Sequence, residues 1–401
     1  MRITEAPTRN TQPPIGNTEA RKSDSTKGKG ALAFFMVSAF RGLAVEFVSC
    51  AFVISLILTL LSLDAFAQDR IRFFDRAAKK EALATGAIQE ETSGHIAYKL
   101  GTSGAIKEIS GPDVLDVTYE MPGANKLDYS RATGEERKAL DVTLKEADRK
   151  KALGEAIKDY EAVLPKLAGD RYQFIRRHLQ FKIGRLLARQ AEDDASQTDA
   201  AITALAQFLK DNPSSWQVVQ CARLLAKLQL AKGDTDSARR TYEQLAATPE
   251  IPNDIKQECD LRMAEALILG KKFADAEKRL QVLLKTLAGD EAQGQRIRIY
   301  LAQCMGASGK LPEAIAQLDG IINKTADKDL KALAYNAMGD CYRLNGKTRE
   351  ALWPYLWVDV IYHQDKQQHV KAMEQLAKIF DEQGEKARAK QYRERLQKEE
   401  R

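Results

Sequence analysis

A small residue recurs through the last two-thirds of the chain at a nearly constant spacing. The positions lie 37 or 38 residues apart and are Ala201, Ala238, Ala276, Ala314, Ala351 and Ala389. Around each alanine, apolar residues recur at i, i+3, i+4 and i+7, which is the periodicity of one face of an α-helix. The pattern predicts two helices in each frame, and therefore a helical repeat array.

The frame at residues 332–358 shows both helices clearly. In the first helix Gly339 and Tyr342 share the apolar face, and Gly346 ends the helix because glycine tolerates the left-handed conformation of helix ends. In the second helix Ala351 opens the apolar face. We expect Gly339 and Ala351 to lie where the two helix axes pass closest, so that neither position has room for a larger side chain.

This frame of a large apolar residue, a small residue, tyrosine, alanine and an aromatic residue resembles the tetratricopeptide repeat. The resemblance covers about residues 135–398 and implies a mainly α protein, a right-handed α-α superhelix of about six or seven repeats. In such a solenoid each repeat buries its apolar face against the next. The period of the family is shorter than the one found here, so longer helices or turns are expected.

The N-terminal region has a different composition. Residues 1–41 are polar, without periodicity, and are predicted to be disordered. Residues 42–67 contain the apolar stretch 43–63, and Ala65-Phe66-Ala67 follows it as an A-x-A cleavage site. These features predict a secretory signal peptide, with an uncleaved transmembrane anchor as the alternative. Both interpretations export the rest of the chain to the periplasm or cell envelope.

Residues 68–120 alternate apolar and polar side chains, as β-strands do. The apolar members of the alternation are Ile71, Phe73, Ile96, Tyr98, Leu100, Leu115, Val117 and Tyr119. Glycine-containing turns, Gly111-Pro112-Asp113 among them, separate the segments. About four short strands are expected, arranged as a small β-barrel or β-meander.

The order of these strands, with a long hairpin and a Gly-Pro-Asp turn before the last strand, resembles an SH3-like or Sm-like barrel. The resemblance implies an adaptor or assembly module, and the alternative is a capping domain over the open end of the array. Residues 121–134 contain proline and glycine and are predicted to be a linker. Residues 135–401 are predicted to be the repeat domain, ending in a polar C-terminal cap.

The charges are numerous but balanced. Lys and Arg number 62 and Asp and Glu 56, which gives a net charge of +6. A nucleic-acid-binding protein usually carries a clear basic patch, and this balance is better explained by solvated helix faces. We therefore expect no nucleic-acid partner, and membrane contact only through residues 42–67 if they remain uncleaved.

No enzyme motif is found in the sequence. G-x-S-x-G, the Walker A motif and G-x-G-x-x-G do not occur, and the four histidines form no H-E-x-x-H. No catalytic residue, metal ligand or cofactor is predicted. His363 and His369 are expected to be a solvated pair in a loop between repeats. An exported enzyme that uses an acidic site without a motif is kept as an alternative.

The cysteines are informative because the expected compartment is oxidising. Cys221 and Cys259 occupy equivalent places in successive repeats, and so do Cys304 and Cys341. Equivalent positions on neighbouring helices lie about 10 Å apart, whereas a disulfide needs Cα atoms within about 7 Å. Four reduced, buried cysteines are therefore predicted.

The tetratricopeptide resemblance implies that the first helices of the repeats line a concave groove for a peptide or protein partner. Carried onto this chain, the groove positions are Gln220, Arg223, Lys227, Glu258, Leu261, Glu265, Arg296, Ile299, Gln303, Asn336, Asp340, Arg343, Glu374 and Lys378. They alternate in sign and contain no Asn-Lys clamp for a terminal carboxylate. An ordinary solvated helix face is the alternative interpretation.

Trp353 and Trp357 lie four residues apart on the second helix of their frame, beside Pro354. We expect them to pack, since large aromatic side chains are usually mostly buried. If they are exposed, they become candidates for an interface hot spot.

The sequence as a whole predicts a non-catalytic protein-interaction scaffold of the cell envelope, whose partner it does not identify. The alternatives are an envelope or secretion assembly factor and a self-associating structural protein, because open solenoid ends can stack.

Overall fold

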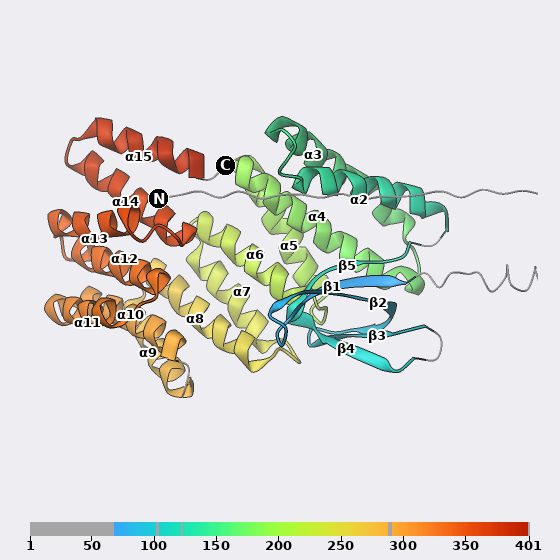
Figure 1. The fold of residues 1–401 in the computed structure, drawn as a ribbon, viewed down its shortest axis with the longest axis horizontal. Coiled ribbons are helices and arrows are strands. Elements are labelled where there is room, and N and C mark those ends of the chain that lie inside the picture. The colour runs from blue at the N-terminus through green and yellow to red at the C-terminus, as the bar shows by residue number, and fades with distance from the viewer. Residues whose placement is uncertain (1–67, 102–103, 122, 288–290, 400–401) are drawn as a thin grey trace, which may run out of the picture. The chain divides into compact units, whose positions relative to one another are not determined.

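The computed structural model describes residues 68–101, 104–121, 123–287 and 291–399, coloured in Figure 1. They form one compact unit. The disordered segment and the signal peptide or anchor predicted for residues 1–67 lie outside this range. Within the described residues, no helix combines the length and apolar character needed to span a bilayer.

The chain begins with five antiparallel strands rather than the expected four or so. They are β1 (Asp69–Asp75), β2 (Lys80–Glu91), β3 (His95–Lys99), β4 (Ile106–Ser110) and β5 (Val114–Thr118). The sheet order is β4-β3-β2-β1-β5, a meander whose last strand returns to pair with the first. The predicted turn at 111–113 is a single 3-10 turn leading into β5.

The long strand β2 joins the two halves of the sheet. Its first part pairs with β1 and its second part with β3, and the register shifts between Ile88 and Glu90. Gly86 lies at the crossing point, where an added Cβ would lie 2.6 Å from the carbonyl oxygen of Lys99. Glycine is required there because the two backbones approach so closely.

Fourteen α-helices follow in the described part of the chain. They are α2 (Lys126–Leu140), α3 (Glu146–Val163), α4 (Gln173–Asp193), α5 (Thr198–Asp211), α6 (Val218–Ala231), α7 (Thr235–Ala247), α8 (Asn253–Leu269), α9 (Phe273–Thr286), α10 (Glu291–Ala307), α11 (Leu311–Lys324), α12 (Lys328–Leu344), α13 (Thr348–Val360), α14 (Lys366–Glu382) and α15 (Lys386–Glu399).

The linker predicted for residues 121–134 is wrong from residue 126 onward, where α2 begins. The helix has few apolar residues and buries Tyr129, Ala132 and Glu136. The apolar periodicity of α2 is too weak to indicate a helix, and the glycine and proline before it favoured the interpretation as a linker. The helical region therefore starts nine residues earlier than predicted.

The helices pack as seven consecutive pairs, from α2 with α3 to α14 with α15. We call α4, α6, α8, α10, α12 and α14 the first helices and their partners the second helices. First helices also contact first helices of neighbouring pairs, as α10 contacts α12 and α12 contacts α14. This stacking confirms the predicted fold class, a mainly α solenoid preceded by a small β-domain (Figure 1).

The recurrent small residues lie where the pairs are tightest. All six alanines of the repeat are fully buried. At Gly339 an added Cβ would lie 2.5 Å from Cζ of Tyr355, which confirms the close approach predicted between the two helices. At Gly184 an added Cβ would lie 2.9 Å from the side chain of Leu205 on the paired helix, and at Gly306 it would lie 2.6 Å from Cys341 on α12, the next first helix.

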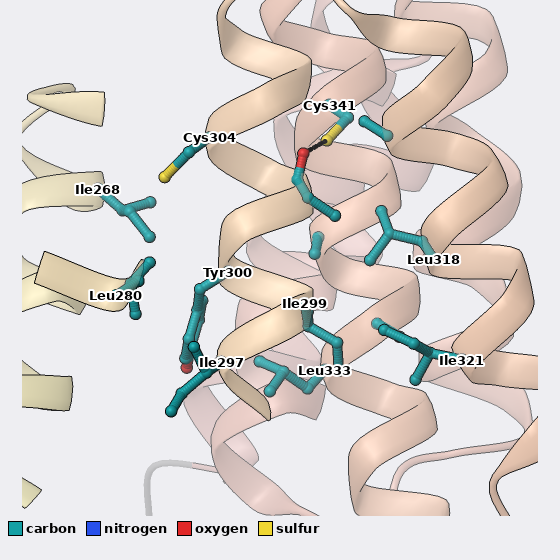
Figure 2. Close-up of a cluster of buried hydrophobic side chains, with 14 of the residues drawn as sticks. Ile268, Leu280, Ile297, Ile299, Tyr300, Cys304, Leu318, Ile321, Leu333 and Cys341 are labelled. Carbon is teal, nitrogen blue, oxygen red and sulfur yellow. Dashed lines mark hydrogen bonds between the residues drawn. The ribbon is translucent and has the colours of Figure 1, made fainter. Parts of the chain in front are cut away.

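The cores of successive repeats are continuous. One cluster of buried side chains runs from α8 to α12 and includes Leu280, Ile297, Leu318 and Leu333, which Figure 2 shows lying between neighbouring helices. A second cluster joins Ile71 and Val117 of the sheet to Leu179 of α4. The β-domain therefore shares its hydrophobic core with α2, α3 and α4, at the start of the helical region.

Candidate partner-binding groove

Four of the predicted groove residues are buried, not open to a partner. Ile299 and Asn336 are fully buried, and Leu261 and Gln303 are nearly so. Ile299 and Leu261 belong to the hydrophobic cluster shared by neighbouring repeats. The groove assignment is wrong for these residues because each first helix turns them toward the adjacent first helix.

Most of the charged groove residues pair with the neighbouring repeat. Each ion pair joins two first helices, across 35 to 39 residues of sequence, and the pairs are Lys227–Glu192, Arg223–Glu258 and Arg343–Glu382. In the last pair two guanidinium nitrogens donate to the two carboxylate oxygens at 2.9 and 2.8 Å. The alternation of sign seen in the sequence therefore serves the array itself, and we call this set the inter-repeat ladder.

Asp340 and Asn336 extend the ladder through further bonds between helices. Asp340 is its centre, since Oδ2 accepts from Gln303 Nε2 at 2.9 Å and from Lys371 Nζ at 2.6 Å, and Oδ1 accepts from Tyr355 at 2.6 Å. Asn336 donates to the backbone and side-chain oxygens of Gln368, both at 2.9 Å. Asp340 and Asn336 thus hold three successive first helices together.

The β-domain covers the predicted groove position at the start of the array. Gln220 of α6 donates to the backbone carbonyl of Val114 in β5, so its assignment to an open groove is wrong. Arg76 donates to Asp113 and to Asp254 of α8, at 2.8 Å each. The contacts with α6 and α8 join residues 106 and 178 positions apart, which no local periodicity could predict.

An open cleft remains further along the first helices. It has a volume of about 110 Å³ and is lined from α8, α10, α12 and α14. Three predicted groove residues line it: Glu265 and Arg296 are partly exposed, whereas Gln303 is almost fully buried in its wall with its amide bonded to Asp340. The sequence analysis missed the other lining residues, Arg262, Tyr300 and Lys371 among them. These three could have been found, because each lies three or four positions from a predicted residue on the same helix.

The cleft contains more positive than negative charge. Arg262 pairs with Glu265 at 2.8 Å, and this carboxylate raises the pKa of the guanidinium. Tyr300 donates to Glu265 at 2.7 Å, and burial together with that carboxylate raises the pKa of the phenol well above its usual value. Arg296 makes no hydrogen bond or ion pair with any residue that the structure describes. Its guanidinium is therefore available for an external carboxylate.

The remaining predicted groove residues, Glu374 and Lys378, are exposed on α14. On α13 the expectation that Trp353 and Trp357 pack is wrong, since they are 67% and 46% exposed. The core positions of that helix are occupied by other side chains, including the fully buried Tyr355. The tryptophans are left on the outer side.

The histidine and cysteine predictions had different outcomes. His363 is exposed, but His369 is buried on α14 with Nε2 3.0 Å from Oδ1 of Asp359, so the predicted solvated pair is wrong. The four cysteines of the repeats are free and buried, as predicted. Burial raises the pKa of the Cys259, Cys304 and Cys341 thiols to about 12, so they remain protonated.

A buried charged network joins α2, α3 and α4. Glu136 accepts from Lys182 and Arg185, both at 2.7 Å, and from the Tyr160 hydroxyl at 2.6 Å. Burial alone would raise the pKa of Glu136, but the two cations lower it below its usual value. The carboxylate is therefore ionised and fully used in holding the helices together.

The chain is similar to known tetratricopeptide repeat proteins. The tetratricopeptide repeat family model matches residues 179–215 and 223–248, which lie in α4 to α7 and confirm repeats of this type. A tetratricopeptide repeat protein from Parabacteroides merdae is 18% identical, with 67% of this chain and 93% of that chain covered and a TM-score of 0.45.

A Rap protein solved with competence and sporulation factor is 13% identical, with 69% of this chain and 76% of that chain covered and a TM-score of 0.41. YrrB, described as a tetratricopeptide protein with an unusual peptide-binding site, is 15% identical, with 48% and 90% covered and a TM-score of 0.29. No curated protein matches the chain.

Proposed function

We propose that the protein is a non-catalytic scaffold of the cell envelope that binds a protein or peptide partner in the cleft of α8, α10, α12 and α14. The observation that carries the proposal is Arg296, a partly buried cation without a partner among the described residues, in a groove whose other charges are paired. A carboxylate on the partner would complete the pairing.

The envelope location rests on the N-terminal sequence. The apolar stretch 43–63 and Ala65-Phe66-Ala67 support export by cleavage, or anchoring by an uncut segment. The β-domain supports an adaptor role, since the strand order with β5 beside β1 and a 3-10 turn before β5 fits an SH3-like barrel. In this proposal the β-domain stabilises the start of the array by packing against it.

The test is a crosslinked capture from envelope fractions with the tagged full chain, followed by mass spectrometry. Arg296→Glu should lose the dominant partner, because the reversed charge repels the partner's carboxylate. Arg298→Glu is the matched control: it lies on the same helix and does not line the cleft, and its one ion-pair partner among the described residues is Glu291, at 3.1 Å.

Arg223 and Arg343 are unsuitable for this test because their reversal would break the inter-repeat ladder. Circular dichroism should show unchanged helix content in both α10 variants. A partner that both variants retain equally would overturn the assignment of the cleft. Equal loss in both would point to a surface outside it.

A further inference from the structure

Helix α13 is apolar on almost every side. From residue 351 to 361 its only charged residue is Asp359, whose side chain is 4% exposed. That carboxylate accepts from Tyr392 at 2.9 Å and pairs with Arg395. A helix that is hydrophobic all round is normally buried in a core or in a membrane.

This helix nevertheless lies at the surface. Four large apolar side chains are exposed, namely Trp353 at 67%, Val360 at 62%, Trp357 at 46% and Ile361 at 45%. They stand at i, i+4, i+7 and i+8, so they form one continuous line along the helix, which we call the α13 stripe. Contiguous exposed apolar surface of this kind marks an interaction site.

Part of the stripe is held in place by aromatic stacking. The Trp357 ring lies 5.8 Å from the Tyr335 ring with an interplanar angle of 10°, and 6.4 Å from the Tyr362 ring. The exposed face of Trp357 is therefore presented in a fixed orientation. Binding to this face therefore costs less side-chain entropy than binding to a freely rotating tryptophan would.

The neighbouring second helix is strongly basic. Between Lys386 and Glu399, α15 has six Lys or Arg residues against two Glu, a net charge of +4. The Asp359–Arg395 pair brings α13 and α15 into contact, and Lys398 lies one turn beyond Arg395. Lys390 is also well exposed, with 76% of its side chain in solvent.

We propose that the α13 stripe and α15 together dock onto the surface of an anionic lipid bilayer. Tryptophan favours the boundary between headgroups and acyl chains, where its ring is buried and its N–H stays hydrated. Lysine and arginine beside it attract anionic headgroups. An apolar stripe with adjacent cations therefore fits the surface of an anionic bilayer, which offers acyl chains beside negative headgroups.

The charges disfavour the other occupants of the stripe. A second copy, paired stripe to stripe about a twofold axis, would bring two α15 helices of net charge +4 toward each other. An amphipathic partner helix normally lies in a groove, whereas the stripe is the outward side of a single helix. The surface is separate from the proposed partner cleft, whose lining comes from the first helices alone.

Tryptophan fluorescence of the full chain with lipid vesicles tests the proposal. The chain has three tryptophans, and Trp216 is fully buried in the core. Quenching by phosphatidylcholine brominated near the headgroup end of its acyl chains therefore reports on Trp353 and Trp357. This readout is independent of the apolar stretch 43–63, which could hold the chain on vesicles without placing α13 in lipid.

We expect quenching and a blue shift with vesicles that contain phosphatidylglycerol, and little change with pure phosphatidylcholine or at high salt. Val360→Asp should weaken the apparent vesicle affinity about tenfold, because it places an anion among anionic headgroups. Val282→Asp on α9 is the matched control, since Val282 is 64% exposed on another second helix. Lys390→Glu with Lys398→Glu should remove the preference for anionic lipid.

Three outcomes would overturn the proposal. The first is a chain that sediments with anionic vesicles while its tryptophans remain unquenched. The second is an equal effect of Val360→Asp and Val282→Asp. The third is a concentration-dependent mass that Val360→Asp abolishes, which would assign the stripe to self-association. The outcome is independent of the Arg296→Glu experiment, so either proposal can fail alone.

Discussion

One added methyl group at Gly339 tests the packing that holds a repeat together. A Cβ at this position would lie 2.5, 2.7 and 2.8 Å from three carbons of the Tyr355 ring, whereas carbon atoms in contact need about 3.5 Å. The ring cannot move aside easily because Tyr355 is fully buried and its hydroxyl donates to Asp340 at 2.6 Å. Gly339→Ala should therefore destabilise the protein.

The free-energy terms can be set against each other. Replacing a helical glycine by alanine gains about 1 kcal/mol of helix propensity. Overpacking a buried site costs about 1–3 kcal/mol, and displacing the ring forfeits a hydrogen bond to a carboxylate, about 1.5–3 kcal/mol. The expected net change in the free energy of unfolding is a loss of about 3 kcal/mol.

Gly320→Ala is the control, because Gly320 is also inside a helix, α11, and an added Cβ there meets nothing within 4 Å. This variant should be unchanged or more stable by up to about 1 kcal/mol. Urea unfolding followed by circular dichroism measures both. The packing argument is refuted if Gly339→Ala matches the wild type, or if the two variants shift in the same direction.

Three more predictions follow from buried groups. Cys221, Cys259, Cys304 and Cys341 should all react with a thiol reagent in the denatured, unreduced chain, and almost none of them should react in the folded chain. Cys50 is not counted among these four thiols. Burial lowers the pKa of His178 in the folded protein. As the pH drops below about 6.5, the imidazole is therefore protonated in the unfolded chain before it is protonated in the folded one, and the free energy of unfolding should fall. His178→Asn should flatten that slope in urea unfolding. Glu136→Gln should cost about 3 kcal/mol because Lys182 and Arg185 lose the carboxylate that bonds to both at 2.7 Å, and Lys182 keeps only Asp116, 3.6 Å away. In the same assay the neighbouring Glu135→Gln, whose ion pair among the described residues is with Lys138 of its own helix, should change stability by less than about 0.5 kcal/mol.

The repeats could be predicted from sequence because their signal is local and repeated. Ala351 and Gly339 recur in equivalent form every 37 or 38 residues, and each copy supports the others. The same periodicity cannot set the exact rotation of a helix about its axis. Ile299 and Leu261 were therefore assigned to the groove, although the structure buries them against the next first helix.

The parts that sequence reasoning missed depend on long-range contacts. β2 is rich in alanine and has no clear apolar alternation, so it is stabilised by its partners β1 and β3 rather than by its own pattern. Helix α2 buries Glu136, a residue type that normally indicates solvent, because Lys182 and Arg185 neutralise it. Such pairings are invisible until the fold brings the partners together.

The inter-repeat ladder limits where this protein can recognise a partner. Arg223, Arg343 and Asp340 are already committed to neighbouring repeats, and a partner that competed for them would have to replace bonds that hold the solenoid together. Breaking a partly buried, hydrogen-bonded ion pair costs more free energy than a new exposed ion pair with the partner would contribute. The two proposals accordingly use groups that lie outside the ladder, namely Arg296 in the cleft and the α13 stripe.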